Sequence, residues 1–293
     1  MPESPEVQAL ADELDARLAG RALTGVDVVE FRIEKTRGRP PESLVGEAVT
    51  GVERHGKLID LVFGDAGRLV VSLGRHGWAR WAAGDGPAPD PAPGDAGDPP
   101  PPTLAILSFD GTGGDGLDLE LTDAGDWVSL GVWVVDEPRE VPAVAKLGPD
   151  PAVPAFTRAD FDAAVVGRRK QAKAILQEQE SLAGIGNAYS DEILHTAKVS
   201  PVVHASSLDG PALDALYAAT VGVVRDAVDA RRGVPIARLK AEKVAAMRVH
   251  GRAGETCPVC GDTVREFSFA STTAEYCPTC QTGGEHLPLR ADR

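Results

Sequence analysis

The sequence predicts an α+β protein with several domains, and three observations lead to this fold class. After one amphipathic segment, the first half of the chain alternates short apolar runs with turn residues, which is typical of antiparallel β-structure. From about Asp150 the apolar residues recur at helical spacing. Near the C-terminus two Cys-Pro-x-Cys pairs indicate a small metal-stabilised module. With 293 residues, the chain is long enough for two compact domains with separate cores.

The first half is predicted to begin with a helix over Pro5–Leu18, which ends at Gly20. Among the apolar runs that follow, Gly64–Asp65–Ala66–Gly67 predicts a hairpin turn. Residues 82–103 are rich in Pro, Gly and Asp and cannot supply a core, so we expect a disordered acidic loop between two strands. The predicted strands are Leu23–Val29, Ala48–Glu53, Leu58–Phe63, Arg68–Leu73, Leu104–Phe109, Leu117–Leu121 and Gly131–Val135.

The second half is predicted to be helical. Thr157 is suited to cap the first of these helices, with Asp160 in its first turn. Two glycines in the segment Ser181–Asn187 predict a tight turn between two helices. The predicted helices are Arg158–Val166, Lys170–Gln177, Asn187–Thr196, Pro211–Ala230 and Pro235–Ala245.

The four cysteines form two pairs, Cys257 with Cys260 and Cys277 with Cys280, separated by 16 residues. Two such turns can bring four sulfurs to one tetrahedral zinc ion. The alternative, two redox-active pairs, fits poorly with the β-rich surroundings of Phe267–Phe269. We therefore predict one structural zinc in a zinc ribbon. A closed four-cysteine site has no open position for a substrate, so the chemistry is expected elsewhere.

The net charge of −14 opposes nucleic-acid binding if it is taken over the whole chain. The acidic excess lies in residues 1–149, with a net charge of −13, against −1 for residues 150–293. Local charge matters most, because physiological salt confines electric fields to ~8 Å. One basic run suits a DNA-facing surface and a solvated helix about equally. It comprises Arg231, Arg232, Arg238, Lys240, Lys243, Arg248 and Arg252.

Several classes of protein are not favoured by the sequence. No apolar run approaches the ~20 residues that a membrane span needs. The start MPESPEVQAL lacks the basic and apolar regions of a secretory signal. There is no phosphate-binding motif for ATP or NAD. Cysteines reserved for zinc fit a reducing compartment, so we expect a cytoplasmic protein without a membrane or nucleotide cofactor.

Pro2 is a candidate nucleophile. A small second residue permits removal of Met1, which would leave a free secondary amine. An α-amino group has a pKa near 8, so roughly a tenth of it is unprotonated at pH 7 and can attack an aldehyde-like carbon. Glu3 lies beside it and could transfer protons. Met-Pro-Glu is a common start, however, so these residues alone do not establish a reaction.

The order of several motifs is more informative than any one of them. Together they resemble the formamidopyrimidine-DNA glycosylase / endonuclease VIII family of base-excision repair enzymes, nearly from end to end. The features are the start MPESPEVQALADEL, the turn Arg54–His55–Gly56–Lys57, the segment GIGNAYSDEILHTAKVSP, the segment Val249–Glu255 and the four-cysteine ribbon.

The resemblance implies an N-terminal β-sandwich with a leading helix over residues 1–145. A helix–two-turn–helix domain over 150–246 and a zinc ribbon over 247–285 would follow. A protein of this kind would act as a monomer on damaged DNA and be associated with the nucleoid when bound.

The resemblance also implies a reaction and its residues. Pro2 would attack C1′ of a damaged nucleoside, the base would leave, and a Schiff base would form before β- and δ-elimination cut the strand. Glu3 matches the residue that assists ring opening. Glu6 matches a second acidic position, which we interpret as structural because it favours the start of the first helix. The predicted activity is that of a bifunctional DNA glycosylase and abasic-site lyase.

Four residues are the candidates for DNA contacts. Lys57 matches a hairpin lysine that contacts a phosphate near the lesion. Asn187 matches an asparagine that binds a phosphate at a helix start, where amides and the helix dipole favour anions. Without the resemblance, a solvated turn lysine and a helix cap would explain these two residues. Arg75 and Arg252 complete the set.

Three positions depart from the family pattern. Thr272 stands where an arginine is usual, and Arg75 stands where a methionine usually fills the space of the flipped base. Ala124–Trp127 replaces a loop with arginine and phenylalanine; Trp127 either wedges into DNA or is a buried core tryptophan. We therefore predict a divergent member that acts at abasic or damaged sugars and has weak activity on 8-oxoguanine opposite cytosine.

Two other hypotheses stay open at this point. The chain could be a non-catalytic protein that binds damaged DNA and retains the fold. It could also be a zinc-ribbon protein for protein partners, which would show no salt-dependent affinity for DNA.

Overall fold

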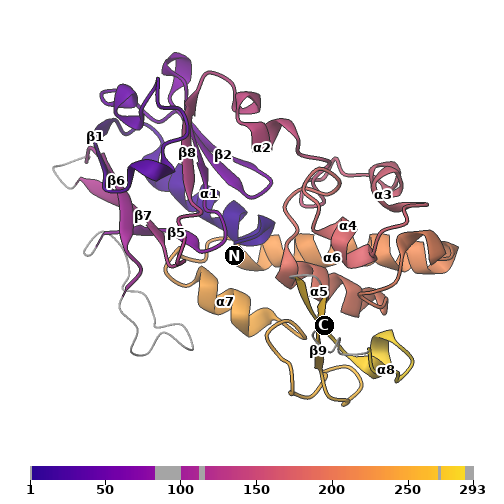
Figure 1. Cartoon of the computed structure of the whole chain (residues 1–293). Coiled ribbons are helices and arrows are strands. Elements are labelled where there is room, and N and C mark those ends of the chain that lie inside the picture. Colours follow the sequence, from indigo (N-terminus) through magenta and orange to yellow (C-terminus); the bar gives the residue numbers. More distant parts are fainter. Residues whose placement is uncertain (1, 83–99, 112–115, 270–271, 288–293) are drawn as a thin grey trace. The chain divides into compact units, whose positions relative to one another are not determined.

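The computed structural model describes residues 2–82, 100–111, 116–269 and 272–287. The chain divides into two compact units. The first comprises Met1–Lys146 together with Arg231–Glu242, and the second comprises Leu147–Ala230 together with Lys243–Arg293. Most of the loop predicted over 82–103 lies outside the described residues. The mixture of sheets and helices confirms the predicted α+β class (Figure 1).

Two four-stranded antiparallel sheets form the first unit and share one hydrophobic core. Residues such as Leu61 and Val71 from one sheet and Leu107 and Leu121 from the other are at most 2% exposed in that core. One sheet has the order β1 (Leu23–Val28), β6 (Thr103–Phe109), β7 (Leu117–Asp123) and β5 (Gly77–Trp81). The other has the order β2 (Gly51–His55), β3 (Leu58–Val62), β4 (Arg68–Ser72) and β8 (Gly131–Val135).

The leading helix α1 (Ser4–Leu18) forms as predicted. Its apolar side chains recur on one face, and Val7, Leu10, Leu14 and Leu18 are at most 1% exposed. Each such burial stabilises the fold by about 1.5–3 kcal/mol, so Leu14→Ala would be among the most damaging changes in the helix. The helix ends at Leu18, and Gly20 follows in the turn with a φ of +84° that suits glycine.

All seven predicted strands form, with ends that differ by a few residues, and the predicted hairpin joins β3 to β4. Strand β5 was not predicted, because its five residues place Arg80 between apolar neighbours and show no clear alternation. The structure explains how the arginine is accommodated. Its Nε lies 2.7 Å from Oε2 of Glu120 on the adjacent strand β7, so the charge is paired across the sheet.

The segment Arg231–Glu242 packs with the first unit although it follows the helical half in sequence. Ile236 and Leu239 are at most 1% exposed in the first core. The carboxylate of Glu13 in α1 accepts hydrogen bonds from Trp81 Nε1 at 2.7 Å and from the amide of Ile236 at 2.6 Å. A helix of the first unit is thereby fixed to a segment more than two hundred residues away in the chain.

The second unit is mainly helical and has its own core around Phe161, Ile175, Tyr189 and Leu216. Thr157 caps the first helix as predicted, since its hydroxyl accepts the Asp160 amide. No helix in the described part of the chain is long and apolar enough to cross a membrane. The helices of this unit are α3 (Arg158–Val165), α4 (Ala172–Leu176), α5 (Asn187–Ala197) and α6 (Gly210–Arg231). The helix α7 (Leu239–Ala246) belongs to the first unit up to Glu242 and to the second from Lys243. A short α2 (Pro142–Ala145) lies in the first unit.

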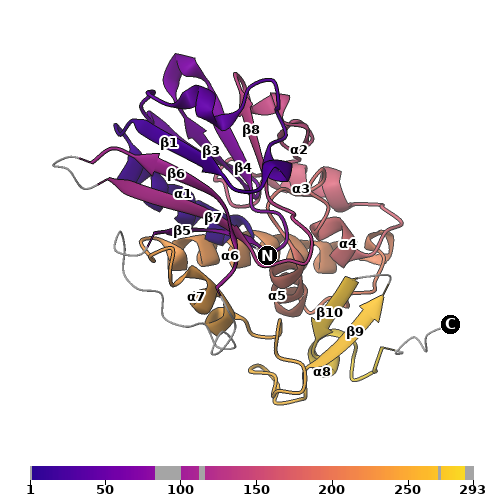
Figure 2. The same ribbon diagram turned by 60° about the vertical axis from the view of Figure 1, so that its left-hand side comes forward.

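The C-terminal module consists of the hairpin β9 (Arg265–Phe269) and β10 (Thr272–Tyr276) followed by α8 (Pro278–Gln281). Figure 2 shows this module beside α5, and both β10 and α8 contact that helix. Arg265 begins one strand and Thr272 begins the other.

Candidate functional site

The start of the chain is buried and fastened by a chain of polar contacts. Pro2 is buried and Glu3 is 1% exposed. The amide of Glu3 donates to Oε2 of Glu6 at 3.2 Å, while Oε1 of Glu6 lies 3.0 Å from Nε of Arg231. The side chains of Glu6 and Arg231 are 1% and 3% exposed, so this is a buried ion pair. Glu6 thus holds the backbone next to Pro2, and Arg231 holds Glu6.

A second tie connects this helix start to the turn that carries Lys57. Arg54 donates from one guanidinium nitrogen to Ser4 Oγ at 3.0 Å and to the carbonyl of Gly56 at 2.7 Å. Its Nε also donates to Gln8 in α1 at 2.9 Å. The turn is tight, with a φ of +58° at Gly56 that suits glycine. The sequence indicates Arg54 only as a member of a motif, and its bridging role had no separate signal.

The base of the same hairpin is braced by a charged cluster. Asp60 is completely buried and lies 2.6 Å from a guanidinium nitrogen of Arg68 and 2.9 Å from Nε2 of His55. Arg68 also pairs with Glu53 at 3.0 Å. The oxygen and nitrogen atoms of these acidic and histidine side chains are close enough to surround a metal ion, but Arg68 already supplies the positive charge there. The cluster is therefore best understood as a structural brace.

Two turns of the first unit are joined by the buried carboxylate of Asp123. Its oxygens accept the amides of Gly125, Ser129 and Leu130 at 2.9, 2.8 and 3.1 Å, and also the Ser129 hydroxyl at 3.0 Å. Burial alone would raise the pKa of Asp123, but these hydrogen bonds lower it below the ordinary value. Ser129 Oγ in turn accepts the Arg75 amide at 2.9 Å, so the turns that carry Arg75 and Trp127 are held together.

The side chains on these two turns face solvent. Trp127 is 83% exposed, which rules out the alternative of a buried core tryptophan. Arg75 is exposed as well. A large aromatic ring held in water by an ordered loop is typical of a binding surface, because stacking on another flat group would recover its apolar area.

Asn187 is the first residue of α5 and follows two buried glycines of the turn. Its Oδ1 accepts Gln177 Nε2 at 2.9 Å. Close to it lies the buried Lys173, whose ammonium contacts the Asn187 carbonyl at 3.4 Å, Ser190 Oγ at 3.1 Å and the carboxylate of Asp191. The sequence did not single out Lys173, because a lysine in a short predicted helix looks like an ordinary surface residue. Because Asp191 balances the charge of Lys173, this pair fastens the start of α5, and it is the N-terminal amides of the helix that favour an anion there.

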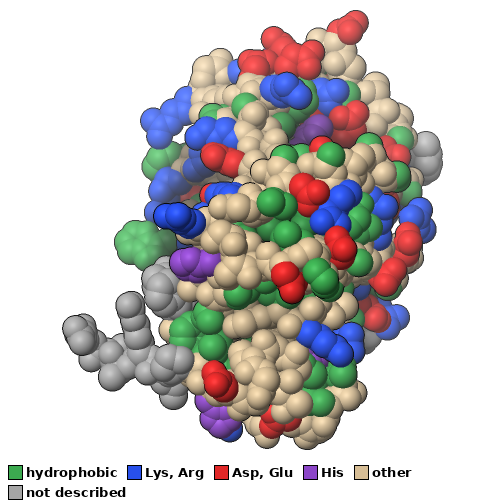
Figure 3. Space-filling view, turned by 90° about the vertical axis from the view of Figure 1, so that its right-hand side faces the viewer, with side chains coloured by type: hydrophobic (Ala, Val, Ile, Leu, Met, Phe, Trp, Pro, Cys, Tyr) green, Lys and Arg blue, Asp and Glu red, His purple; other side chains and the backbone are tan. Residues whose placement is uncertain are grey.

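Arg252 is largely engaged within the protein. Its guanidinium donates to the carbonyls of Val244 at 3.1 Å and Met247 at 3.4 Å, and it reaches Glu255 at 3.4 Å. The basic run predicted from the sequence is also broken by the buried Arg231 and by Arg238, which pairs with Glu242 at 2.8 Å. Figure 3 shows basic and acidic side chains interspersed over one face of the molecule. The basic residues between Arg231 and Arg252 therefore do not form one continuous basic surface.

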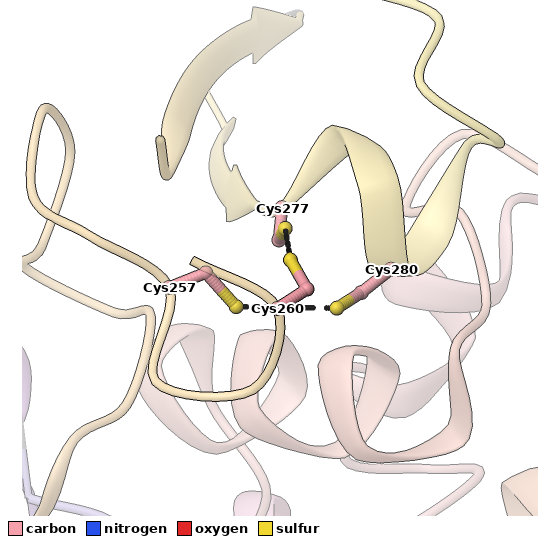
Figure 4. Close-up of side chains that lie close together, drawn as sticks. All are labelled: Cys257, Cys260, Cys277 and Cys280. Carbon is pink, nitrogen blue, oxygen red and sulfur yellow. Dashed lines mark hydrogen bonds between the residues drawn. The ribbon is translucent and has the colours of Figure 1, made fainter. Parts of the chain in front are cut away.

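The four cysteines converge in the second unit (Figure 4). Their sulfurs all lie within 4.8 Å of one another, with 3.9 Å between Cys257 and Cys280 and 3.3 Å between Cys260 and Cys277. Tetrahedral zinc with Zn–S bonds of ~2.3 Å places its sulfurs about 3.8 Å apart, so the geometry fits. Burial raises the pKa of Cys280 to about 11 and that of Cys277 further, so zinc must displace their protons when it binds.

Known proteins match the chain over nearly its whole length. The N-terminal domain of formamidopyrimidine-DNA glycosylase matches residues 1–126, the H2TH domain of that enzyme matches 147–236, and the zinc finger found in FPG and IleRS matches 254–283. A formamidopyrimidine-DNA glycosylase from Geobacter metallireducens is 32% identical over 290 residues, which covers 96% of this chain and 100% of that protein. The chain belongs to the formamidopyrimidine-DNA glycosylase family.

Other relatives agree with this family. An uncharacterized formamidopyrimidine-DNA glycosylase-like protein of Mycobacterium tuberculosis is 49% identical over 152 residues, which covers 52% of this chain and 93% of that protein. The Lactococcus lactis enzyme, solved with DNA containing an abasic site, has a TM-score of 0.77 and 25% identity over 96% of this chain and 99% of its own. MutM in complex with DNA containing carbocyclic 8-oxo-G has a TM-score of 0.79 and 26% identity over 96% and 100%.

These findings confirm the family resemblance and the expected fold of a sheet domain with a leading helix, an H2TH domain and a zinc finger. The matching zinc-finger family and the sulfur geometry together establish one structural zinc site of the FPG type. The roles of the individual residues at the start of the chain and on the turns stay predictions.

Proposed function

We propose that this chain is a DNA glycosylase of base-excision repair that also cleaves abasic sites, with the amine of Pro2 as its nucleophile. The observation that carries the proposal is the fastening of the chain start. Glu6, Arg231 and Arg54 fix the residues on either side of Glu3 in a chain that matches the formamidopyrimidine-DNA glycosylase family nearly throughout. A nucleophile must be held in an attacking geometry, and a rigid first helical turn provides this.

In the proposed reaction, the unprotonated nitrogen of Pro2 forms a bond to C1′ while the bond from C1′ to the damaged base breaks. The base departs with that electron pair and takes up the proton that the Pro2 nitrogen loses after its attack. Glu3 protonates the ring oxygen as the sugar opens, which leaves an iminium between Pro2 and C1′. Loss of a proton from C2′ expels the 3′ phosphate, a second elimination expels the 5′ phosphate, and water then releases Pro2.

Phosphates of the damaged strand are the proposed ligands of Lys57 and Asn187. The glycine turn and the N-terminal amides of α5 support an anion site at Asn187, while the charge of Lys173 is balanced by Asp191. Arg252 would have to exchange its contact with Glu255 for a phosphate. The family members solved with abasic-site and 8-oxo-G DNA support damaged DNA as the partner.

The lesion preference is proposed from the two exposed turns. Arg75 and Trp127 offer a flat cation and an indole, which stack on bases with little regard for sequence. We expect abasic or damaged sugars to be processed, with weak activity on 8-oxoguanine opposite cytosine.

The test is borohydride trapping on an oligonucleotide with a single abasic site. Borohydride reduces an iminium to a stable amine, so the mature protein should give a covalent band, and mass spectrometry should place the adduct on the Pro2 peptide. A form extended at the N-terminus has no free Pro2 amine and should give no band, while Pro2→Gly should trap poorly. If the mature protein binds this DNA without any band, a non-catalytic damage-binding role replaces the proposal.

A further inference from the structure

A buried histidine from the H2TH region touches a zinc ligand. His195 lies near the end of α5, is 2% exposed, and has Nε2 3.3 Å from Sγ of Cys257. Cys257 itself is 1% exposed. The other ring nitrogen, Nδ1, is buried and has no hydrogen-bond partner among the residues that the structure describes.

We propose that His195 donates a hydrogen bond from Nε2 to the zinc-bound thiolate of Cys257, so that α5 supplies part of the outer shell of the zinc site. The alternative tautomer would place an N–H at Nδ1, where it would be buried without an acceptor. The neutral ring with its hydrogen on Nε2 and the protonated ring both carry the required N–H. The contact therefore does not depend on the charge of the histidine.

The chemistry of the site calls for such a donor. Four thiolates around Zn²⁺ leave two excess negative charges, and buried sulfurs cannot spread them to water. Cys257 and Cys277 are both almost completely buried, so the protein must supply the polarising groups for them. Outer-shell donors of this kind fix the orientation of a ligand and strengthen metal binding.

The position of the histidine is fixed by independent contacts between the C-terminal module and α5. Gln281 donates from Nε2 to the carbonyl of Val199 at 2.9 Å and accepts the Cys277 amide at 2.9 Å. One carboxylate oxygen of Glu192 accepts three successive amides, those of residues 248, 249 and 250, at 3.0, 2.9 and 2.9 Å. Glu192 lies one turn before His195 and Val199 lies just beyond the end of α5, so the helix around His195 is anchored to the C-terminal module at both ends of this stretch.

The proposal links zinc occupancy to the stability of α5. Loss of zinc would remove the charged acceptor and leave the His195 N–H facing an uncharged thiol. The same helix begins at Asn187, about two turns earlier. Zinc removal should therefore loosen α5 as well as the ribbon.

The first experiment measures zinc release from the full chain to an excess of chelator, followed with a coloured metal indicator. His195→Phe fills the space without a donor and should release zinc about 10–100-fold faster than the wild type. His195→Gln restores an N–H at a similar reach and should release it more slowly than His195→Phe. His204→Phe, a change at an exposed histidine of the same unit, should leave the rate unchanged. Equal rates for the wild type and His195→Phe would overturn the proposal.

A second experiment uses the unmodified sequence and so does not depend on whether a variant folds. The zinc is replaced by cadmium-113, and nuclear magnetic resonance measures the coupling between the metal and the His195 side chain. A hydrogen on Nε2 with a small coupling to the metal through the sulfur is the expected result. A hydrogen only on Nδ1, or a large coupling that shows the ring nitrogen bound directly to the metal, would contradict the proposed contact.

Discussion

At the start of α1 the candidate catalytic residues Pro2 and Glu3 are buried, whereas the turns of Arg75 and Trp127 present their side chains to solvent. Both regions are fastened by internal contacts, but of different kinds. The start of α1 is held by the buried ion pair between Glu6 and Arg231. The exposed turns are held by hydrogen bonds from backbone amides to the Asp123 carboxylate, which do not use the side chains of Arg75 and Trp127. The proposed catalytic residues lie where the fold depends on their surroundings. The proposed recognition residues are exposed and can change with little effect on the fold.

The largest expected effect is the loss of stability when the ion pair between Glu6 and Arg231 is broken. Arg231→Met would leave the carboxylate of Glu6 buried without its charged partner, which should lower the free energy of unfolding by about 3–5 kcal/mol. Urea denaturation would measure it. The neighbouring Arg232 is exposed, and Arg232→Met should stay within about 0.5 kcal/mol of the wild type. Similar stability for the two variants would show that the start of α1 does not rely on buried charge.

Asp123→Asn tests the hydrogen bonds that hold the two exposed turns together. It replaces a carboxylate that accepts several hydrogen bonds and should cost about 1–3 kcal/mol at pH 7. The pKa of Asp123 is lowered by folding, so its contribution is complete above the unfolded pKa near 3.9 and disappears as the pH falls through the folded pKa. Thermal unfolding at a series of pH values should therefore show the two proteins converging below about pH 4. Asp126→Asn, at an exposed position of the same loop, should match the wild type throughout.

Trp127→Ala asks whether the exposed turns recognise DNA. Stability should change by no more than about 0.5 kcal/mol, since the indole is 83% exposed. Affinity for a duplex with an abasic site should fall by about 1–3 kcal/mol, as expected for the loss of one stacking contact. Phe31 is 67% exposed in the same unit, and Phe31→Ala is the matched control. Equal losses of affinity in both variants would point to a general surface effect.

The smallest effect is expected at the proposed phosphate contacts. Lys57→Gln should reduce the slope of the logarithm of the binding constant against the logarithm of salt concentration by about one. Arg252→Gln should change that slope less, because Arg252 already donates to two carbonyls and contacts Glu255. Fluorescence anisotropy over a range of salt concentrations would measure both slopes. A larger change for Arg252→Gln would mean that its internal contacts yield to DNA.

Most helices and strands could be predicted from patterns of neighbouring residues in the sequence. The spacing of Val7, Leu10 and Leu14 predicted α1, and the glycines at 64 and 67 predicted the hairpin, because these signals lie within a few residues of one another. Strand β5 was missed because the partner of Arg80 lies on another strand. A residue whose role depends on a distant partner leaves no such local signal.

The candidate site shows the same limit. The spacing of the cysteines predicted a zinc site, now established with its family. In the sequence Arg231 belongs to a basic run, yet its side chain is buried against Glu6, which lies near the start of the chain. His195 is one histidine among apolar helix residues, and nothing in its neighbourhood indicates that Cys257 lies against it.

The discontinuous make-up of the first unit has a consequence for biosynthesis. Arg231, Ile236 and Leu239 belong to its buried interior but are translated only after residues 147–230 of the second unit. Until then Glu6 has no ion pair with Arg231, Glu13 has no hydrogen bond from the Ile236 amide, and the core lacks Ile236 and Leu239. The N-terminal unit therefore matures only after the C-terminal part has been made, so an interrupted translation product should be an early target of proteases.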